Sequence, residues 1–242
     1  MANGLFTLVS KLGSTQLQNI VANLGLESAV EEGRTVIDYK LYDRQVINYG
    51  ITSIASGVIT AKTGTFVMPS LTQFFNKTAE GRTLQGLQIA NNTSRINNLV
   101  LDGKADEPYR FDRLAVDVEV FDCTAADGGA AGLKNAGGVS DESAQVLAQI
   151  LRSGKLILNV NGRDLNYAEP LGFGGSSIAV DGSNVKNMYN KKTPKYIDPA
   201  IFLPETTSFN AKIEMIEPVE IPAYMSVAIT VCMIGYKFLK NS

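Results

Sequence analysis

The chain has 242 residues, a formal net charge of −2, two cysteines and no histidine. Without histidine it lacks the commonest general base and metal ligand, and two cysteines are too few for a zinc site or a disulfide framework. We therefore expect a structural or binding protein with no catalytic residue, no cofactor, no metal and no specific affinity for nucleic acid, rather than an enzyme.

Residues 1–33 predict an N-terminal helical arm. Lys11 is the only charged side chain before Glu27, so the arm has an apolar stripe with little charge opposite it. This pattern is typical of a helix packed on its own domain, or of an arm that contacts a neighbouring subunit or a lipid surface. We expect neither a secretory signal peptide nor a transmembrane helix. The candidate assembly or membrane-contact residues of the stripe are Leu5, Phe6, Leu8, Val9 and Leu12.

Strand patterns follow from residue 34 onward. A β-branched run covers 35–43, and 57–68 predicts a hairpin around Lys62-Thr63-Gly64. Residues 71–75 suggest one helical turn, and 83–89 and 96–101 flank a turn cluster. The clearest strand is 109–122, because apolar and acidic side chains alternate along it with a period of two. Its expected buried face carries Leu114, Val116, Val118 and Val120.

The second half begins with a Gly/Ala-rich loop at 123–138, which predicts a boundary or a long crossover. A helix is expected at 140–151, with Ser140 as its N-cap and Gly154 as a left-handed stop. Strands are predicted at 155–160 and 163–167, joined by an Asn161-Gly162 turn. An alternating strand is expected at 208–216. The segment 227–238 is apolar on both faces and therefore predicts a central strand covered on both sides.

These elements predict a mainly β fold, because about a dozen strands accompany two helices and no alternating βα units are present. The fold class that we expect is an antiparallel jelly-roll sandwich with an N-terminal helical arm and one inserted helix, with a double jelly roll favoured and a single roll possible. The corresponding regions are the arm, a first sandwich region at 34–125 and a second at 126–242. Turn spacing does not distinguish one large roll from two small ones.

Three groups of polar residues have alternative interpretations. Asp117 and Glu119 share a strand face about 7 Å apart, which suits either a hydrolytic carboxylate pair or a solvated face. Asp102, Asp106 and Glu107 lie in one loop, where a calcium site is conceivable although the spacing is not that of an EF-hand. A tyrosine-containing basic stretch is either a nucleic-acid or headgroup patch or a solvated loop. That stretch contains Lys186, Tyr189, Lys191, Lys192, Lys195 and Tyr196.

The C-terminal segments resemble the last strands of jelly-roll major capsid proteins from tailless icosahedral, membrane-containing bacteriophages. The resemblance covers about 40 residues: Phe202-Leu203-Pro204-Glu205, Phe209 to Ile213, Ile221-Pro222-Ala223, Val227 to Val231 and Gly235-Tyr236-Lys237-Phe238. The helix at 140–151 and the low-charge N-terminal segment are also similar to features of double jelly-roll coats. Two complete rolls would need about sixteen strands, and 242 residues is a short chain for that number. A single roll therefore remains an alternative.

The resemblance implies a viral structural protein that self-assembles into an icosahedral shell. The implied partners are copies of the chain, as a trimer, other capsid proteins and, through the N-terminal arm, an internal viral membrane. The implied location is the virion, after synthesis in the host cytoplasm. The alternative function is a β-sandwich binding or adhesion module for a carbohydrate or receptor, which would use an exposed aromatic platform.

Overall fold

The computed structural model describes ten stretches of the chain and shows a mainly β, antiparallel protein. The described residues are 35–55, 58–78, 83–84, 87–88, 97–124, 141–167, 171, 179–181, 184–186 and 194–240. The predicted N-terminal arm, with Leu5, Phe6, Leu8, Val9 and Leu12, lies outside them. So do residues 125–138 of the Gly/Ala-rich loop and Tyr189, Lys191 and Lys192.

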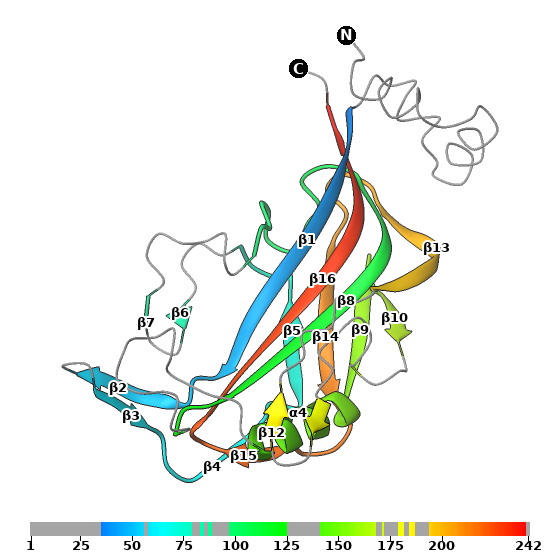
Figure 1. Cartoon of the computed structure of the whole chain (residues 1–242). Helices are drawn as coiled ribbons and strands as arrows, with labels where there is room; N and C mark the ends of the chain where they lie inside the picture. Colours follow the sequence, from blue (N-terminus) through cyan, green and yellow to red (C-terminus); the bar gives the residue numbers. More distant parts are fainter. Residues whose placement is uncertain are drawn as a thin grey trace.

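Eight strands form two four-stranded sheets (Figure 1). The first sheet has the order β1 (Thr35–Asn48), β16 (Met225–Leu239), β8 (Tyr109–Asp122) and β13 (Lys195–Leu203). The second has the order β10 (Arg163–Tyr167), β9 (Gly154–Val160), β14 (Phe209–Met215) and β5 (Leu71–Phe74). All their pairings are antiparallel.

Four strand pairs and one described helix complete the elements. The pairs are β2 (Ile51–Ala55) with β3 (Val58–Ala61), β4 (Thr65–Val67) with β15 (Glu220–Pro222), β6 (Thr83–Leu84) with β7 (Leu87–Gln88), and β11 (Ala179–Asp181) with β12 (Asn184–Lys186). Helix α4 (Asp141–Ser153) lies at the lower end of the molecule in Figure 1.

The strand order interleaves the two halves of the chain. If the eight sheet strands are numbered along the chain, the sheets are ordered 1-8-3-6 and 5-4-7-2. Each sheet therefore contains strands from 34–125 and from 126–242, so these two predicted regions do not form separate sets of sheets. In the described chain, both halves contribute to a single pair of four-stranded sheets.

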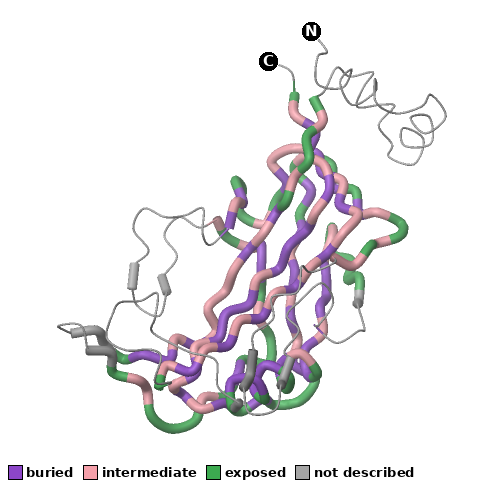
Figure 2. Tube along the Cα trace, viewed as in Figure 1, coloured by how far each residue is buried: buried purple, intermediate pink, exposed green. Residues whose placement is uncertain are grey.

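One apolar core joins the two sheets, as the buried inner strands of Figure 2 show. Period-two alternation places Val116 and Val118 of β8 in the core, and their partners on β16 are Val231 and Ile229. From the second sheet, Leu158 and Ile213 are 2% and 0% exposed. Large side chains fill the space between the sheets, so burial of apolar area holds the sheets together.

Several predicted elements are confirmed. Strand β8 covers 109–122 with the expected buried face, and β14 alternates between buried and half-buried positions. Strand β16 lies centrally between β1 and β8, as predicted, but its outer face is only partly covered. Ala228 and Cys232 are buried there, whereas Ser226, Thr230 and Ile234 are half-buried. Helix α4 buries Val146, Leu147 and Ile150. Asn161 and Gly162 both have positive φ angles, as a two-residue turn between β9 and β10 requires.

Three local predictions are wrong. The expected hairpin at 57–68 does not form, because β3 pairs with β2 and β4 pairs with β15. Residues 71–74 form strand β5 instead of a helical turn, because pairing with β14 supplies their backbone partners. Gly154 has no positive φ and begins β9. It suits a close approach, because an added Cβ would lie 2.2 Å from Leu171 Cδ1.

Candidate functional site

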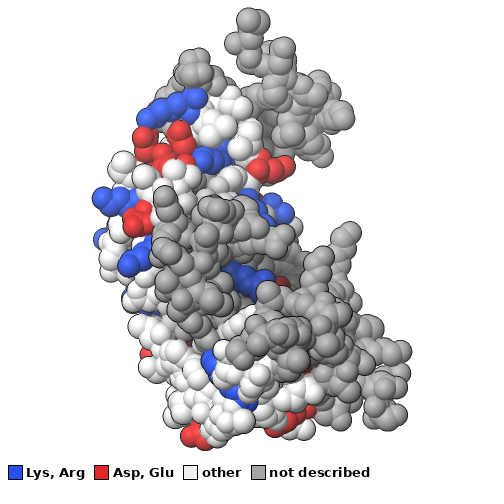
Figure 3. Space-filling view, turned by 90° about the vertical axis from the view of Figure 1, so that its left-hand side faces the viewer, with Lys and Arg blue, Asp and Glu red and all other residues white. Residues whose placement is uncertain are grey.

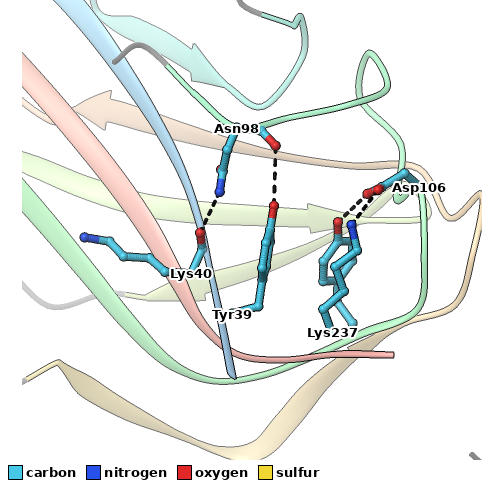
Figure 4. Close-up of polar contacts among 6 residues, drawn as sticks. Tyr39, Lys40, Asn98, Asp106 and Lys237 are labelled. Atoms are coloured by element: carbon cyan, nitrogen blue, oxygen red, sulfur yellow. Dashed lines mark hydrogen bonds and ion pairs between the residues drawn. The ribbon is translucent and has the colours of Figure 1, made fainter. Parts of the chain in front are cut away.

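A connected polar cluster lies at the end of the sandwich where β16 finishes (Figure 4). Lys237 Nζ, on β16, lies 2.7 Å from Asp106 Oδ2, in the loop before β8. The Tyr109 hydroxyl donates a hydrogen bond to Asp106 Oδ1. Lys237 Nζ also lies 5.2 Å from the Tyr39 ring centroid and 5.3 Å from that of Tyr109. The ammonium group therefore interacts with one carboxylate and two aromatic faces.

Burial and hydrogen bonding act in opposite directions on the carboxyl group of this cluster. Burial works to raise the pKa of Asp106, but hydrogen bonds from Lys237 and Tyr109 and the charge of Lys237 outweigh it and lower that pKa below its ordinary value. Burial, together with the neighbouring Asp106 carboxylate, raises the pKa of Tyr109 and of Tyr39. The cluster therefore holds an ionised Asp–Lys pair beside two neutral phenols, which is an arrangement for fixing chain segments together.

The free edge of β1 is closed beside this cluster by Asn98. Its side-chain Oδ1 accepts a hydrogen bond from the Tyr42 N–H at 2.9 Å, and its Nδ2 donates to the Lys40 carbonyl at 2.8 Å. The Tyr39 hydroxyl donates to the Asn98 carbonyl at 3.5 Å (Figure 4). Asn98 thus occupies backbone groups that an added strand would need.

A buried carboxylate organises the same side of the sandwich. Asp43 is 0% exposed, and its Oδ2 accepts a hydrogen bond from the Phe75 N–H at 2.7 Å. Phe75 has a φ of 61°, a left-handed conformation that is unusual for a bulky residue. Asn97 Nδ2 donates to the Lys77 carbonyl at 2.9 Å. Asp43 and Asn97 therefore hold the turn that follows β5.

Three of the carboxylates predicted as alternative sites already interact with other groups of the chain. Glu119 Oε2 lies 2.6 Å from Arg44 Nη2 on the outer face of the first sheet, and Asp117 is opposite Thr230. Asp102 Oδ1 accepts the Thr78 N–H at 2.6 Å, whereas Asp106 interacts with Lys237. In the described part of the chain, no three acidic, histidine or cysteine side chains converge as metal ligands would.

The two cysteines lie far from each other, and the described residues of the basic stretch lie on different strands. Cys123 and Cys232 are not joined in a disulfide. Cys123 Sγ lies 3.1 Å from Ser226 Oγ, and Cys232 is six residues further along the extended strand β16, about 20 Å away. That separation is too large for a disulfide. In the basic stretch, Lys186 lies on β12, whereas Lys195 and Tyr196 lie on β13.

Just over half of the large exposed apolar side chains share a location that the sequence did not indicate. Five of the nine large hydrophobic side chains exposed in the described chain lie on the edge strands of the two sheets. All four edge strands carry at least one, and β13 carries Tyr196 and Phe202, which are 70% and 53% exposed. The others are Ile37 on β1, Leu165 on β10 and Leu71 on β5.

Sequence patterns could not locate this set, because alternation indicates which face of a strand is buried and not which strand lies at an edge. The outer face of the molecule also varies along its length. In Figure 3, charges of both signs crowd the upper end, and the lower end is mostly uncharged. We regard the apolar edge positions as the candidate functional surface.

Comparison with known proteins gives no assignment. No family model matches the chain, and neither a curated protein nor a solved structure is significantly similar to it. No helix in the described residues has the length and apolar character needed to cross a bilayer.

Proposed function

We propose that this chain is a single jelly roll that serves as a structural subunit of a virus shell, the major capsid protein of a tailless icosahedral bacteriophage. The observation that carries the proposal is the placement of exposed apolar side chains on all four edge strands of a densely packed sandwich. Isolated proteins generally protect their sheet edges with charge or covering segments, so apolar edges are typical of surfaces that contact other molecules.

The strand pairing supports the jelly-roll part of the proposal. The first four sheet strands pair with the last four in reverse order, as β1·β16, β5·β14, β8·β13 and β9·β10, alternating between the sheets. Winding one long antiparallel ribbon around a barrel gives this order, and eight such strands make one complete roll. We therefore favour a single roll over the double roll, which would need about twice as many strands.

Viral coats, lectins and cupins all use jelly rolls, so the fold alone does not select a function. The sequence has no histidine for a cupin-type metal centre or a histidine-dependent active site, and we propose no catalytic role. Large side chains also occupy the interior between the sheets, where a ligand would otherwise bind. Lateral contact between copies of the chain would instead use the exposed apolar side chains of the edge strands.

The proposed partners are copies of this chain, in trimers or larger closed assemblies, together with other capsid proteins. The location would be the virion after synthesis in the host cytoplasm. Contact with an internal membrane through residues 1–33 is part of the proposal and depends only on the sequence pattern of that segment. No specific nucleic-acid partner is proposed.

Light scattering after size exclusion, with electron microscopy of the eluted particles, tests self-assembly. We expect the full chain to form a discrete oligomer or shell, and the Tyr196→Asp, Phe202→Asp variant to elute as a folded monomer. Val100→Asp is the control, because Val100 is 58% exposed but lies in the loop before β8 and on no strand. A monomeric wild-type chain, or a double variant that assembles normally, would contradict the proposal.

A carbohydrate- or receptor-binding module is the second candidate, and the 70% exposure of Tyr196 is the observation that favours it. An exposed aromatic ring can stack on a sugar. A monomeric chain that binds a glycan array, and loses that binding in Tyr196→Ala, would support this alternative.

A further inference from the structure

An apolar surface that shares Leu71 with the edge positions lies where β4 and β5 run beside the chain that links β14 to β15. Val67 in β4 is the partner of Glu220, and Leu71 in β5 is the partner of Glu214. Between these pairs, two backbone hydrogen bonds of 2.9 Å join the connecting loops. Because the backbone on both sides is hydrogen-bonded, the side chains here project from a fixed frame.

This surface exposes five apolar residues, which we call the lower patch. Ile216, Val67 and Leu71 are 66%, 57% and 45% exposed, and Pro69 and Pro218 are exposed beside them. The Ile216 N–H donates to the carbonyl of Ser153, at the end of α4, at 2.8 Å. The lower patch therefore joins the second sheet, the β4–β15 pair and the end of the helix.

Acidic side chains border the lower patch. Glu217 and Glu220 are exposed, and Glu214 pairs with Lys155 at 2.8 Å. Two copies meeting patch to patch would bring their glutamates together, and an anionic lipid surface would also be repelled. The fitting occupant is an apolar segment with a positive charge.

The chain itself contains such a segment. The stripe from Leu5 to Leu12 is apolar, and Lys11 is its only charged side chain. The 22 residues from Gly13 to Arg34 connect it to β1 and can span up to about 75 Å when extended. Strand β1 begins at the upper end in Figure 1 and is about 46 Å long, whereas β4 and β15 lie at the lower end. Reaching its own patch would require the segment to run back along the whole subunit.

We propose that the lower patch of one copy binds residues 5–12 of a second copy, with Lys11 facing Glu217 and Glu220. The inference rests on the proposed self-assembly and names one of its contacts. Such a contact is head-to-tail, because a segment from one end of a subunit binds the opposite end of its neighbour. Repeated around a symmetry axis, it closes into a ring.

Charge reversal in the full chain tests the ionic part of this contact. Lys11→Glu should raise the protein concentration needed for half-maximal assembly by about fivefold. Adding Glu217→Lys and Glu220→Lys to the same chain should restore the wild-type concentration. Lys104→Glu, at an exposed position in the loop before β8, is the control and should have no effect. Failure of the triple variant to recover would overturn the inference.

Cysteine cross-linking tests the geometry. A mixture of Val9→Cys and Ile216→Cys chains should give a disulfide-linked dimer on mild oxidation, whereas Val9→Cys with Val100→Cys should not. A cross-linked monomer from a chain carrying both Val9→Cys and Ile216→Cys would show that the segment binds its own subunit and would overturn the proposal. Assembly without either cross-link would reject this contact and leave the proposed function standing. A monomeric wild-type chain would reject both.

Discussion

Lys237 and Asp106 form an ion pair of 2.7 Å that ties the last strand of the first sheet to the loop preceding β8. The two residues are 131 positions apart, and their side chains are only 11% and 16% exposed. An ion pair in this setting contributes to stability only while both partners are present, because either charge alone would be buried without compensation.

Replacement of the lysine by an apolar residue should therefore destabilise the fold. We expect Lys237→Met to lower the free energy of unfolding by about 3 kcal/mol, because Asp106 loses its cationic partner. Urea denaturation followed by circular dichroism should show a lower midpoint with an unchanged slope.

The matched control is Lys240→Met, whose pair with Glu205, at 2.6 Å, is 57% and 35% exposed. Its effect should stay within about 0.5 kcal/mol, since solvent screens an exposed pair. Equal effects of the two substitutions would show that burial does not strengthen the Lys237 pair.

The same pair predicts an acid-dependent loss of stability. The folded-state pKa of Asp106 is lowered, although burial opposes this, because Lys237 and Tyr109 stabilise the ionised form. In the unfolded chain the carboxyl group titrates near its usual pKa of about 3.9. Ionised Asp106 therefore contributes its full stabilisation of the fold above about pH 4 to 5. This stabilisation is lost as the pH falls through the lower folded-state pKa of Asp106.

Unfolding free energies measured at neutral pH and at progressively lower pH should fall less steeply for Asp106→Asn than for the wild-type chain. Asp164→Asn is a suitable control, because Asp164 interacts with Asn159 at the exposed turn between β9 and β10. An Asp106→Asn profile identical to that of the wild type would contradict this assignment.

Gly235 should not tolerate a side chain. It lies at a register shift in β16, opposite Phe111, and an added Cβ would be 2.0 Å from the Arg110 carbonyl oxygen. Gly235→Ala must therefore push β16 away from β8, and we expect a cost of about 2 to 3 kcal/mol in thermal or urea unfolding.

Gly64→Ala provides the comparison, because Gly64 has a φ of 92° but nothing within 4 Å of an added Cβ. Only backbone strain disfavours alanine at this position, so Gly64→Ala should lower the free energy of unfolding by about 1 kcal/mol. A smaller loss for Gly235→Ala than for Gly64→Ala would mean that the two strands can separate without penalty.

The sequence by itself determined which faces of the long strands are buried. Alternation in 109–122 and 208–216 placed Val116 and Ile213 in the core, and Asn161-Gly162 determined a tight turn. These features depend on residues close together in the chain, whose side chains alternate or whose φ angles are restricted locally.

Only the tertiary structure decided which strands are neighbours. Thr65–Val67 pairs with a strand about 155 residues later, although the adjacent chain offered a plausible hairpin, and 71–74 is extended because β14 lies beside it. The Lys237–Asp106 pair and the apolar edge positions follow from the same long-range pairing. Periodicity along one segment carries no information about the partner that completes its hydrogen bonds, so the edges of the sheets and their exposed side chains emerged only when the whole chain was folded.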